Sequence, residues 1–251
     1  GEQSELNQMP VEECGNMLIQ VAALCKTRND VRYAAHYWVV LSQWAAYLLD
    51  KGFDPDNQLC TDDFAGHLAH NVNLSVKAIL GVGAFAQLCE QRGLTDEAVK
   101  YRTHAEEMVD RWLHDADDGE HYRLTFDKPG TWSQKYNLVW DNLLGLGLFP
   151  DEVVEKEITY YKTKLNTYGL PLDNRSTYTK LDWSVWIASM SDKPDDFAVF
   201  IDPIYRWMND TESRVPLTDW YFTDTGLKRA FQARPVVGGV FIRMLYDTVL
   251  W

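Results

Sequence analysis

The spacing of apolar residues along the chain predicts a series of helices. Apolar side chains recur every three to four positions, which is the period of an amphipathic helix, and turn-forming residues separate the segments. No alternating pattern is long enough to build a sheet. We therefore expect an all-α fold. The predicted helices span residues 10–24, 33–49, 62–91, 95–114, 132–146, 151–165, 179–190, 194–209 and 237–251.

The predicted helices are of two kinds, which indicates two layers. Helices rich in aromatic and polar residues alternate with charged helices, and the short connections favour antiparallel helix hairpins. This pattern fits the inner and outer layers of a helical toroid. A simple bundle or an α-solenoid is the alternative, although no fixed-period repeat supports a solenoid.

The predicted helix 62–91 has two unlike faces. At about 100° per residue, its apolar residues gather on one side and short polar residues on the other. A solvated face is usually built from Glu, Lys and Arg, whereas these side chains gain from fixed partners, so we predict that they line a polar cavity. The alternative is a partly buried helix whose Asn and His bond neighbouring backbone groups. The polar face consists of Asp63, His67, His70, Asn71, Asn73 and Lys77.

Three of these residues also have a spacing that suits a metal. On a helix, Asp63, His67 and His70 would project from one face and could hold a divalent ion. A fourth ligand is not evident, and His and Asn serve equally well as hydrogen-bond partners. There is no Gly-rich phosphate loop and no nucleophile elbow. We expect neither a metal nor another cofactor.

Three tryptophans stand directly beside aspartates. An aromatic platform next to a carboxylate suits a site that stacks an apolar face while it holds polar groups. The alternative for each pair is a core tryptophan beside a capping aspartate. The pairs are Trp140-Asp141, Asp182-Trp183 and Asp219-Trp220.

Carboxylates supply the candidates for acid–base chemistry. Asp63, Asp141 and Asp182 each lie on or beside a predicted helix with polar residues facing inward. Glu12 and Glu13 would join them if the start of their helix opens into the cavity, and the alternative is that they only stabilise the positive end of the helix dipole. Of the two, Glu13 is the catalytic candidate. Arg234 precedes the last helix and could clamp a substrate carboxylate, or it could form a structural ion pair.

The charge of the chain argues against some partners. With 24 Lys and Arg against 37 Asp and Glu, the formal net charge is −13, which disfavours nucleic acid and anionic membrane surfaces. No apolar run approaches the roughly 20 residues that a membrane helix needs. We expect a small polar molecule as substrate, and neither nucleic acid nor a membrane as partner.

Several long motifs are similar to a known family. The chain resembles the secreted glutaminase A proteins of fungi and bacteria, specifically their six-hairpin helical domain, and the likeness covers nearly the whole sequence. The motifs are 9–18 (MPVEECGNML), 62–71 (DDFAGHLAHN), 135–141 (KYNLVWD), 168–173 (YGLPLD), 182–183 (DW), 218–221 (TDWY) and 233–239 (ARPVVGG).

The resemblance implies an (α/α) six-hairpin toroid similar to glycosidase catalytic domains. Residues 1–251 would form this single domain as the C-terminal part of a larger protein, preceded by a β-sandwich region and by the first toroid helices, which this chain lacks. It also implies secretion and hydrolysis of the L-glutamine side-chain amide to glutamate and ammonia.

The roles of single residues rest on the chemistry that this reaction needs. We expect Asp63 or Asp182 as base, Arg234 as carboxylate clamp, and Asn71, Asn73 and Lys77 as donors to the developing oxyanion. A second hypothesis is a glycoside hydrolase or carbohydrate-binding toroid that uses paired carboxylates and tryptophan platforms. A third is a helical fragment that binds a ligand or partner without catalysis.

Overall fold

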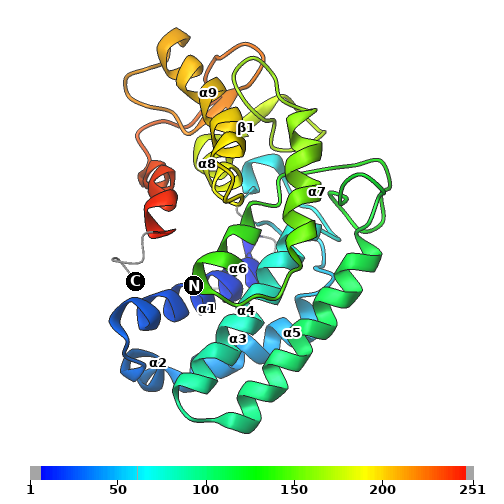
Figure 1. Ribbon diagram of the computed structural model, residues 1–251, viewed down its shortest axis with the longest axis vertical. Coiled ribbons are helices and arrows are strands. Elements are labelled where there is room, and N and C mark those ends of the chain that lie inside the picture. The colour runs from blue at the N-terminus through cyan, green and yellow to red at the C-terminus, as the bar shows by residue number, and fades with distance from the viewer. Residues whose placement is uncertain (1–6, 61, 247–251) are drawn as a thin grey trace.

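The computed structural model describes residues 7–60 and 62–246 and shows a mostly helical chain (Figure 1). Two short strands, β1 (Tyr178–Lys180) and β2 (Trp220–Phe222), pair antiparallel. The α-helices are α1 (Pro10–Arg28), α2 (Arg32–His36), α3 (Trp38–Lys51), α4 (Val72–Gln91), α5 (Thr95–Asp115), α6 (Val139–Leu144), α7 (Asp151–Lys162), α8 (Leu181–Ala188) and α9 (Pro194–Asp210). The 3-10 helices are η2 (Asp63–Ala65), η3 (Tyr136–Leu138) and η4 (Pro235–Tyr246).

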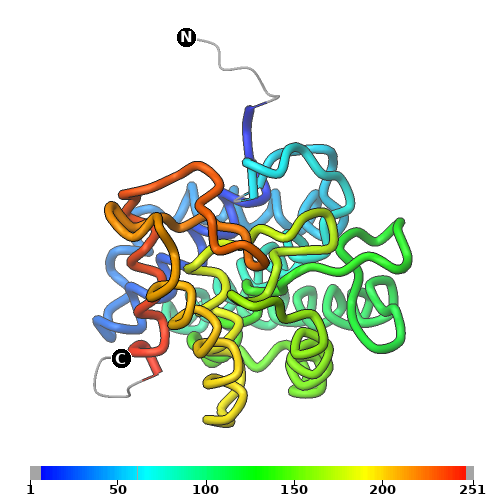
Figure 2. The backbone as a smooth tube through the Cα atoms, turned by 90° about the horizontal axis from the view of Figure 1, so that it is seen from above, coloured from blue at the N-terminus to red at the C-terminus, as the bar shows by residue number. Residues whose placement is uncertain are grey.

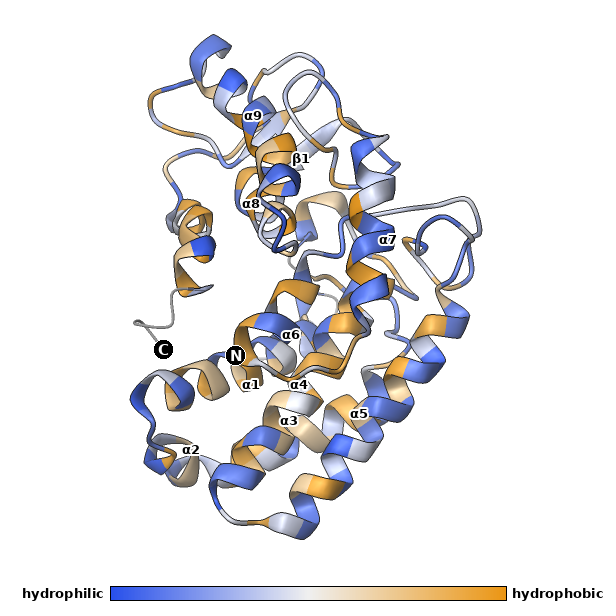
Figure 3. Ribbon diagram, viewed as in Figure 1, coloured by the Kyte–Doolittle hydropathy of each residue, from blue (hydrophilic) through white to orange (hydrophobic). Residues whose placement is uncertain are grey.

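Helix α4 is the centre of the hydrophobic core. Every residue from Val72 to Ala86 is buried, because α1, α3 and α5 pack around the helix (Figure 1). Figure 3 shows apolar residues along α3 and α4, and many hydrophilic residues on α5. By length and composition α4 could cross a membrane, so the expectation that no apolar run is long enough was wrong. In this structure α4 is a core helix covered by its neighbours.

Helices α1 and α4 approach closely because both carry glycine where they cross. A Cβ added at Gly81 would lie 3.1 Å from the Cα of Gly15 and 2.8 Å from Leu48 Cδ1. A Cβ at Gly15 would lie 2.7 Å from Cγ of Lys77. The crossing therefore brings the first turn of α1, with its two glutamates, beside Lys77.

The remaining helices continue from this core in an arc (Figure 1). After α6 the chain passes through α7, α8 and α9, and η4 packs against α8. Figure 2 shows that the connections 52–60, 62–71, 163–177 and 211–234 gather on the same side of the molecule. Segments far apart in sequence thus meet on one face.

The predicted helix 62–91 begins ten residues later than expected. Residues 62–71 are irregular apart from η2, and α4 starts at Val72. The side chain of Asn71 is the helix cap, since its Oδ1 accepts from the amides of Asn73 and Leu74 at 3.0 Å each. Just before it, His70 has a φ of 60°, a left-handed backbone conformation that interrupts a right-handed helix. The expected polar helix face therefore does not exist before Asn71.

Other boundaries differ from the prediction in smaller ways. The segment 33–49 is broken at Tyr37 into α2 and α3, and 132–146 is reduced to η3 and α6, which ends at Gly145 in the left-handed conformation. The segment 179–190 opens as strand β1 before α8. The last segment is the 3-10 helix η4, and its final residues, 247–251, lie outside the described residues. The helices expected at 95–114, 151–165 and 194–209 are confirmed as α5, α7 and α9.

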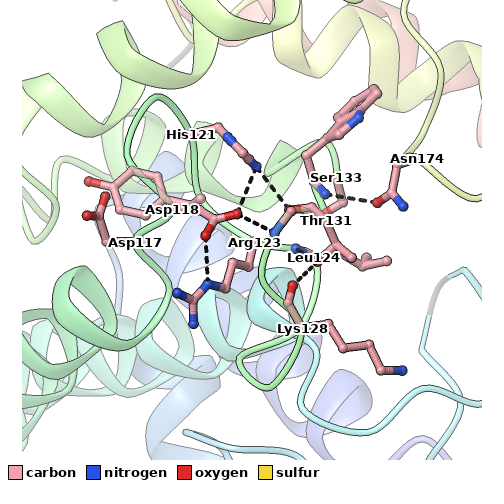
Figure 4. A network of polar contacts seen from close by, with 12 residues as sticks. Asp117, Asp118, His121, Arg123, Leu124, Lys128, Thr131, Ser133 and Asn174 are labelled. Carbon is pink, nitrogen blue, oxygen red and sulfur yellow. Dashed lines mark hydrogen bonds and ion pairs between the residues drawn. The ribbon is translucent and has the colours of Figure 1, made fainter.

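A polar network fixes the long connector between α5 and η3 (Figure 4). Asp118 accepts from the amide of Gly130 at 2.6 Å and from Arg123 Nε at 3.3 Å. The amide of Trp132 donates to Asn174 Oδ1 at 2.9 Å. The first two bonds close the connector on itself and the third ties it to the segment after α7, so the connector is held in place without a helix of its own.

Candidate active site

A polar pocket of about 280 Å³ opens between the start of α1, the segment around η2, the junction of β1 with α8, and the residues that lead into η4. It brings together five residues expected from the sequence: Glu13, Asp63, Asp182, Trp183 and Arg234. Met9, Glu12, Asn16, Lys180 and Val236 complete the lining. A larger cavity of about 530 Å³ lies elsewhere, between α6 and α7, and includes Asp141.

One wall of the pocket is built on a buried aspartate that holds two cations. Asp219 is fully buried and accepts from Arg234, from Nη2 at 2.6 Å and Nε at 3.3 Å, and from Lys180 Nζ. Burial opposes ionisation, but the hydrogen bonds from Arg234 and Lys180 outweigh it and lower the pKa of Asp219. The Arg234 side chain is 36% exposed and lines the pocket. Asp219 thus positions the arginine and does not itself line the pocket.

Asp182 is the carboxyl beside these charges. It lies in the first turn of α8, is 2% exposed, and its Oδ1 has no hydrogen-bond partner and is 4.0 Å from Lys180 Nζ. Burial raises its pKa to about 6, although Lys180 opposes the shift. A carboxyl that titrates close to neutral pH inside a pocket is suited to proton exchange.

Trp183 is held between aromatic rings. Its ring stacks on Tyr136 with centroids 4.3 Å apart and planes 6° apart, and Trp186 meets it edge-on at 4.8 Å. Its indole Nε1 has no hydrogen-bond partner. Because one face is already stacked, the residue offers less platform for a ligand than the sequence suggested.

The other two tryptophan–aspartate pairs do not line this pocket. Asp141 accepts hydrogen bonds from the amides of Leu148 and Phe149 at 2.9–3.1 Å, so it fixes the loop after α6. Its neighbour Trp140 packs against Trp186. Trp220 packs among core aromatics, including Phe64 and Phe231. In both pairs the tryptophan packs against other aromatic rings and the aspartate has partners within the protein, so neither pair forms a ligand platform in this pocket.

None of the side chains expected as oxyanion donors lines the pocket. Asn71 caps α4. Lys77 forms a buried ion pair with Glu12. Asn73 is buried outside the pocket, and its side-chain Oδ1 has no hydrogen-bond partner among the described residues. His67 is exposed in the irregular segment before α4 and lies outside the pocket lining. Of this set only Lys77 touches the pocket wall, and it does so through Glu12.

The spacing argument for a metal fails because the residues are not on a helix. His70 pairs with Asp54 at 2.7 Å, a hydrogen bond that raises the pKa of His70. Among residues 7–60 and 62–246 no group of three or more His, Cys, Asp or Glu side chains is arranged to hold a metal ion.

Sequence reasoning missed Lys180. Lys180 is 2% exposed between the carboxylates of Asp182 and Asp219, which a composition pattern does not reveal. The one available signal was a lysine two positions before Asp182. Its position at the end of β1, paired with β2, places it next to Asp219.

Comparison with known proteins identifies the family of the chain. Residues 1–244 match the family model described as glutaminase A six helical-hairpin domain. The chain belongs to the glutaminase A family. A glutaminase A of Aspergillus oryzae is 37% identical over 247 residues, which cover 95% of this chain and 35% of that protein. A probable glutaminase of Arthroderma benhamiae is 33% identical over 249 residues, which cover 84% of this chain and 29% of that protein.

The glutaminase A match includes every residue that lines the pocket. The chain spans about a third of the length of these curated relatives. The relatives therefore support membership of a glutaminase A family of hydrolases, within which the pocket is the candidate site.

Proposed function

We propose that the chain is the helical part of an amidohydrolase that converts L-glutamine to L-glutamate and ammonia. The names of the relatives support this reaction. The observation that carries it is the pocket itself, where one arginine, several carboxylates and a buried carboxyl with a raised pKa line about 280 Å³. Such a set matches a small zwitterion with a reactive amide.

The two charged ends of the amino acid have complementary partners. Arg234 is held by two bonds to Asp219 and its partly exposed guanidinium still has donors for a substrate carboxylate. Glu13 and Asp63 are exposed carboxylates on the pocket lining and suit the substrate ammonium group. Fixing both ends orients the side-chain amide within the pocket.

The acid–base step is assigned to Asp182. As a carboxylate it takes a proton from water while the water oxygen bonds to the amide carbon. The C–N bond then breaks and a proton must reach the leaving nitrogen, giving a carboxylic acid and ammonia. Because the pKa of Asp182 is about 6, this carboxyl is ionised at neutral pH and still basic enough to accept the proton.

The finer architecture and location are part of the same proposal. The arc of helix pairs supports placement in an (α/α) toroid, and the glutaminase A likeness supports a secreted protein with an upstream β-sandwich region. Small-angle scattering of the protein encoded by the complete open reading frame would distinguish a closed toroid with an added domain from an open helical arc.

Ammonia release tests the proposed reaction directly. The assay compares L-glutamine, D-glutamine and L-asparagine as substrates. It uses the 251-residue chain and the protein that the complete open reading frame encodes. Asp182→Asn and Arg234→Ala should each lower kcat/KM for L-glutamine at least about 100-fold, which is about 2.7 kcal/mol. Absence of ammonia release by both forms of the wild-type protein would refute the reaction, and wild-type turnover in either variant would remove that residue from the mechanism.

A glycoside hydrolase is the second candidate. The carboxylates Glu13, Asp63 and Asp182 beside Trp183 favour it, since two carboxyls flanking a sugar bond can act as acid and base. Only one of the three tryptophan–aspartate pairs lines the pocket among the described residues, which supports a sugar platform less than the sequence did. Release of reducing sugar from an oligosaccharide panel, without ammonia release from glutamine, would favour this candidate.

A further inference from the structure

The proposed hydrolysis needs a group that stabilises the amide oxygen. When water bonds to the amide carbon, the carbonyl oxygen becomes an oxyanion, and donors fixed toward that oxygen usually lower the barrier more than any other single feature. The side chains expected for this task, Asn71, Asn73 and Lys77, do not line the pocket. Among the described residues that line it, the cations are Lys180 and Arg234. Arg234 is assigned to the substrate carboxylate, so Lys180 is the cation left for the amide oxygen.

The backbone holds Lys180 rigidly beside the pocket. Lys180 is the last residue of β1, where it pairs with Trp220 of β2, and α8 begins at the next residue. The amide of Leu181 donates to the backbone oxygen of Asp219 at 2.8 Å, which ties the start of α8 to the residue before β2. The Lys180 side chain is thus positioned by a strand and a helix, and sites on such elements are more precise than sites on loops.

Two carboxyls and two aromatic rings surround the Lys180 ammonium group. Nζ donates to Asp219 Oδ2 and lies 4.0 Å from Asp182 Oδ1. Its distances to the ring centroids of Phe64 and Phe231 are 5.7 and 5.9 Å. In the described part of the chain, Asp219 is the one hydrogen-bond acceptor of Nζ, whereas an ammonium group has three donors. Two N–H groups are therefore available to a molecule in the pocket.

We propose that Lys180 is the catalytic residue that donates a hydrogen bond to the amide oxygen as it becomes an oxyanion. This assignment rests on the proposed amide hydrolysis with Asp182 as base. Asp182 takes a proton from water, the water oxygen bonds to the amide carbon, and the π electron pair of the C=O bond moves to the oxygen beside Nζ. The pair then re-forms the C=O bond, the C–N bond breaks, and Asp182 returns its proton to the nitrogen, which leaves as ammonia. Lys180 keeps all its protons throughout.

The charge next to Lys180 stays balanced during this step. Asp219 already accepts two bonds from Arg234, so Lys180 is a second cation on one carboxylate, and the ionised Asp182 4.0 Å away supplies the other negative charge. When Asp182 takes the proton it becomes neutral, and the negative charge moves to the amide oxygen. The same ammonium group then faces the oxyanion instead of the carboxylate. Because Lys180 is only 2% exposed, little water screens this attraction.

The test compares Lys180→Met with wild type on L-glutamine and on its γ-thioamide, in whichever form of the protein is active. Both substrates release ammonia, but a thioamide sulfur accepts hydrogen bonds more weakly than a carbonyl oxygen. We expect Lys180→Met to lower kcat on L-glutamine about 100- to 1000-fold, the usual effect of removing one oxyanion donor, and to leave KM within about threefold of wild type.

The ratio of the two rates is the readout that a merely structural lysine does not change. Wild type should prefer L-glutamine over the thioamide more strongly than hydroxide in solution does, because Lys180 stabilises charge on oxygen better than on sulfur. In Lys180→Met this ratio should fall at least about 10-fold, toward that of the hydroxide reaction.

Lys162→Met is the matched control. Lys162 also pairs with a buried aspartate, Asp196, but both residues lie outside the pocket lining. Its loss removes the same charge without removing a donor from the pocket. Both kcat and the rate ratio should therefore stay within about twofold of wild type.

Lys180→Gln provides a second variant if Lys180→Met does not fold. Its neutral amide can still donate to Asp219, so the buried carboxylate keeps this partner. Without the positive charge, kcat on L-glutamine should fall at least about 10-fold, and the rate ratio should fall with it. If neither variant folds, the wild-type ratio decides, because a ratio equal to that of the hydroxide reaction shows that no donor acts on the oxygen.

The outcomes separate the two proposals. A wild type that releases no ammonia overturns the proposed reaction and the role of Lys180 with it. With an active wild type, only the role of Lys180 is overturned if Lys180→Met keeps its kcat, or if it raises KM alone, as a displaced Arg234 would. A loss of kcat that leaves the wild-type rate ratio intact also overturns that role, since the lysine then acts only through the fold. A wild-type ratio equal to the hydroxide ratio overturns it as well.

Discussion

Replacement of Lys77 by methionine should lower the free energy of unfolding far more than the loss of an exposed ion pair does. Lys77 and Glu12 pair with side chains that are only 4% and 3% exposed, and Asn16 adds a hydrogen bond to Glu12 at 2.9 Å. Without the lysine, a carboxylate remains in the core with one neutral donor. Breaking one partner of a buried pair typically costs about 3–5 kcal/mol, a large part of the roughly 5–15 kcal/mol that stabilises a domain.

Urea unfolding followed by tryptophan fluorescence measures this loss. With a slope of about 3 kcal/mol per molar urea, a loss of about 4 kcal/mol moves the midpoint by more than about 1 M. The double variant Glu12→Gln/Lys77→Met removes both charges and should recover most of the stability. Lys193→Met breaks an exposed pair with Glu155, with side chains 67% and 61% exposed, and should cost at most about 1 kcal/mol.

Two results would refute the reasoning. One is a Lys77→Met midpoint close to that of Lys193→Met, and the other is a double variant no more stable than Lys77→Met alone. A variant that keeps its stability but loses glutamine turnover would instead support the earlier expectation that Lys77 donates directly to the substrate.

The remaining predictions concern pH, a second buried pair and the helix crossing. Because the pKa of Asp62 is raised from 3.8 to about 7, its contribution to stability is present below pH 4 and is lost as the pH rises to 7. Asp62→Asn should therefore be more stable than wild type at pH 8 but not at pH 4, and equal differences in urea midpoint at both would contradict this. Lys135 and Glu157 are fully buried, 3.7 Å apart, so Glu157→Leu should cost about 3–5 kcal/mol in the same unfolding assay, and a loss below 1 kcal/mol would count against it. Gly15→Ala places a methyl group against Lys77 and should cost about 1–3 kcal/mol, whereas an unchanged midpoint would show that the crossing relaxes freely.

Much of the helical framework could be predicted from the sequence because helix formation depends on local periodicity. Helices α5, α7 and α9 begin at their expected positions, since each carries one apolar stripe and acidic residues in its first turn. The start of α4 was missed for the same local reason. Residues 62–71 continue the periodic pattern, but the cap at Asn71 and the positive φ of His70 end it.

Residue chemistry alone also identified part of the candidate site. Glu13, Asp63, Asp182, Trp183 and Arg234 were chosen as polar or aromatic residues at helix starts and loops, and all five line one pocket. Asn71, Asp141 and Lys77 were chosen on the same grounds and have internal partners instead. A sequence shows that a side chain can bond, but it does not show whether a backbone amide or a buried charge already occupies it.

What only the tertiary structure decided is the electrostatic state of the carboxyls. Asp62 and Asp63 are neighbours in sequence with identical chemistry, yet Asp62 is enclosed near Glu12 and Asp173 while Asp63 is exposed. Such shifts depend on burial and on charges contributed by distant segments. The sequence by itself determined the helices, the family and a set of candidate side chains, because these depend on local pattern and residue type. The packing of distant segments determined which side chains share a pocket, and which carboxyls hold a proton near neutral pH.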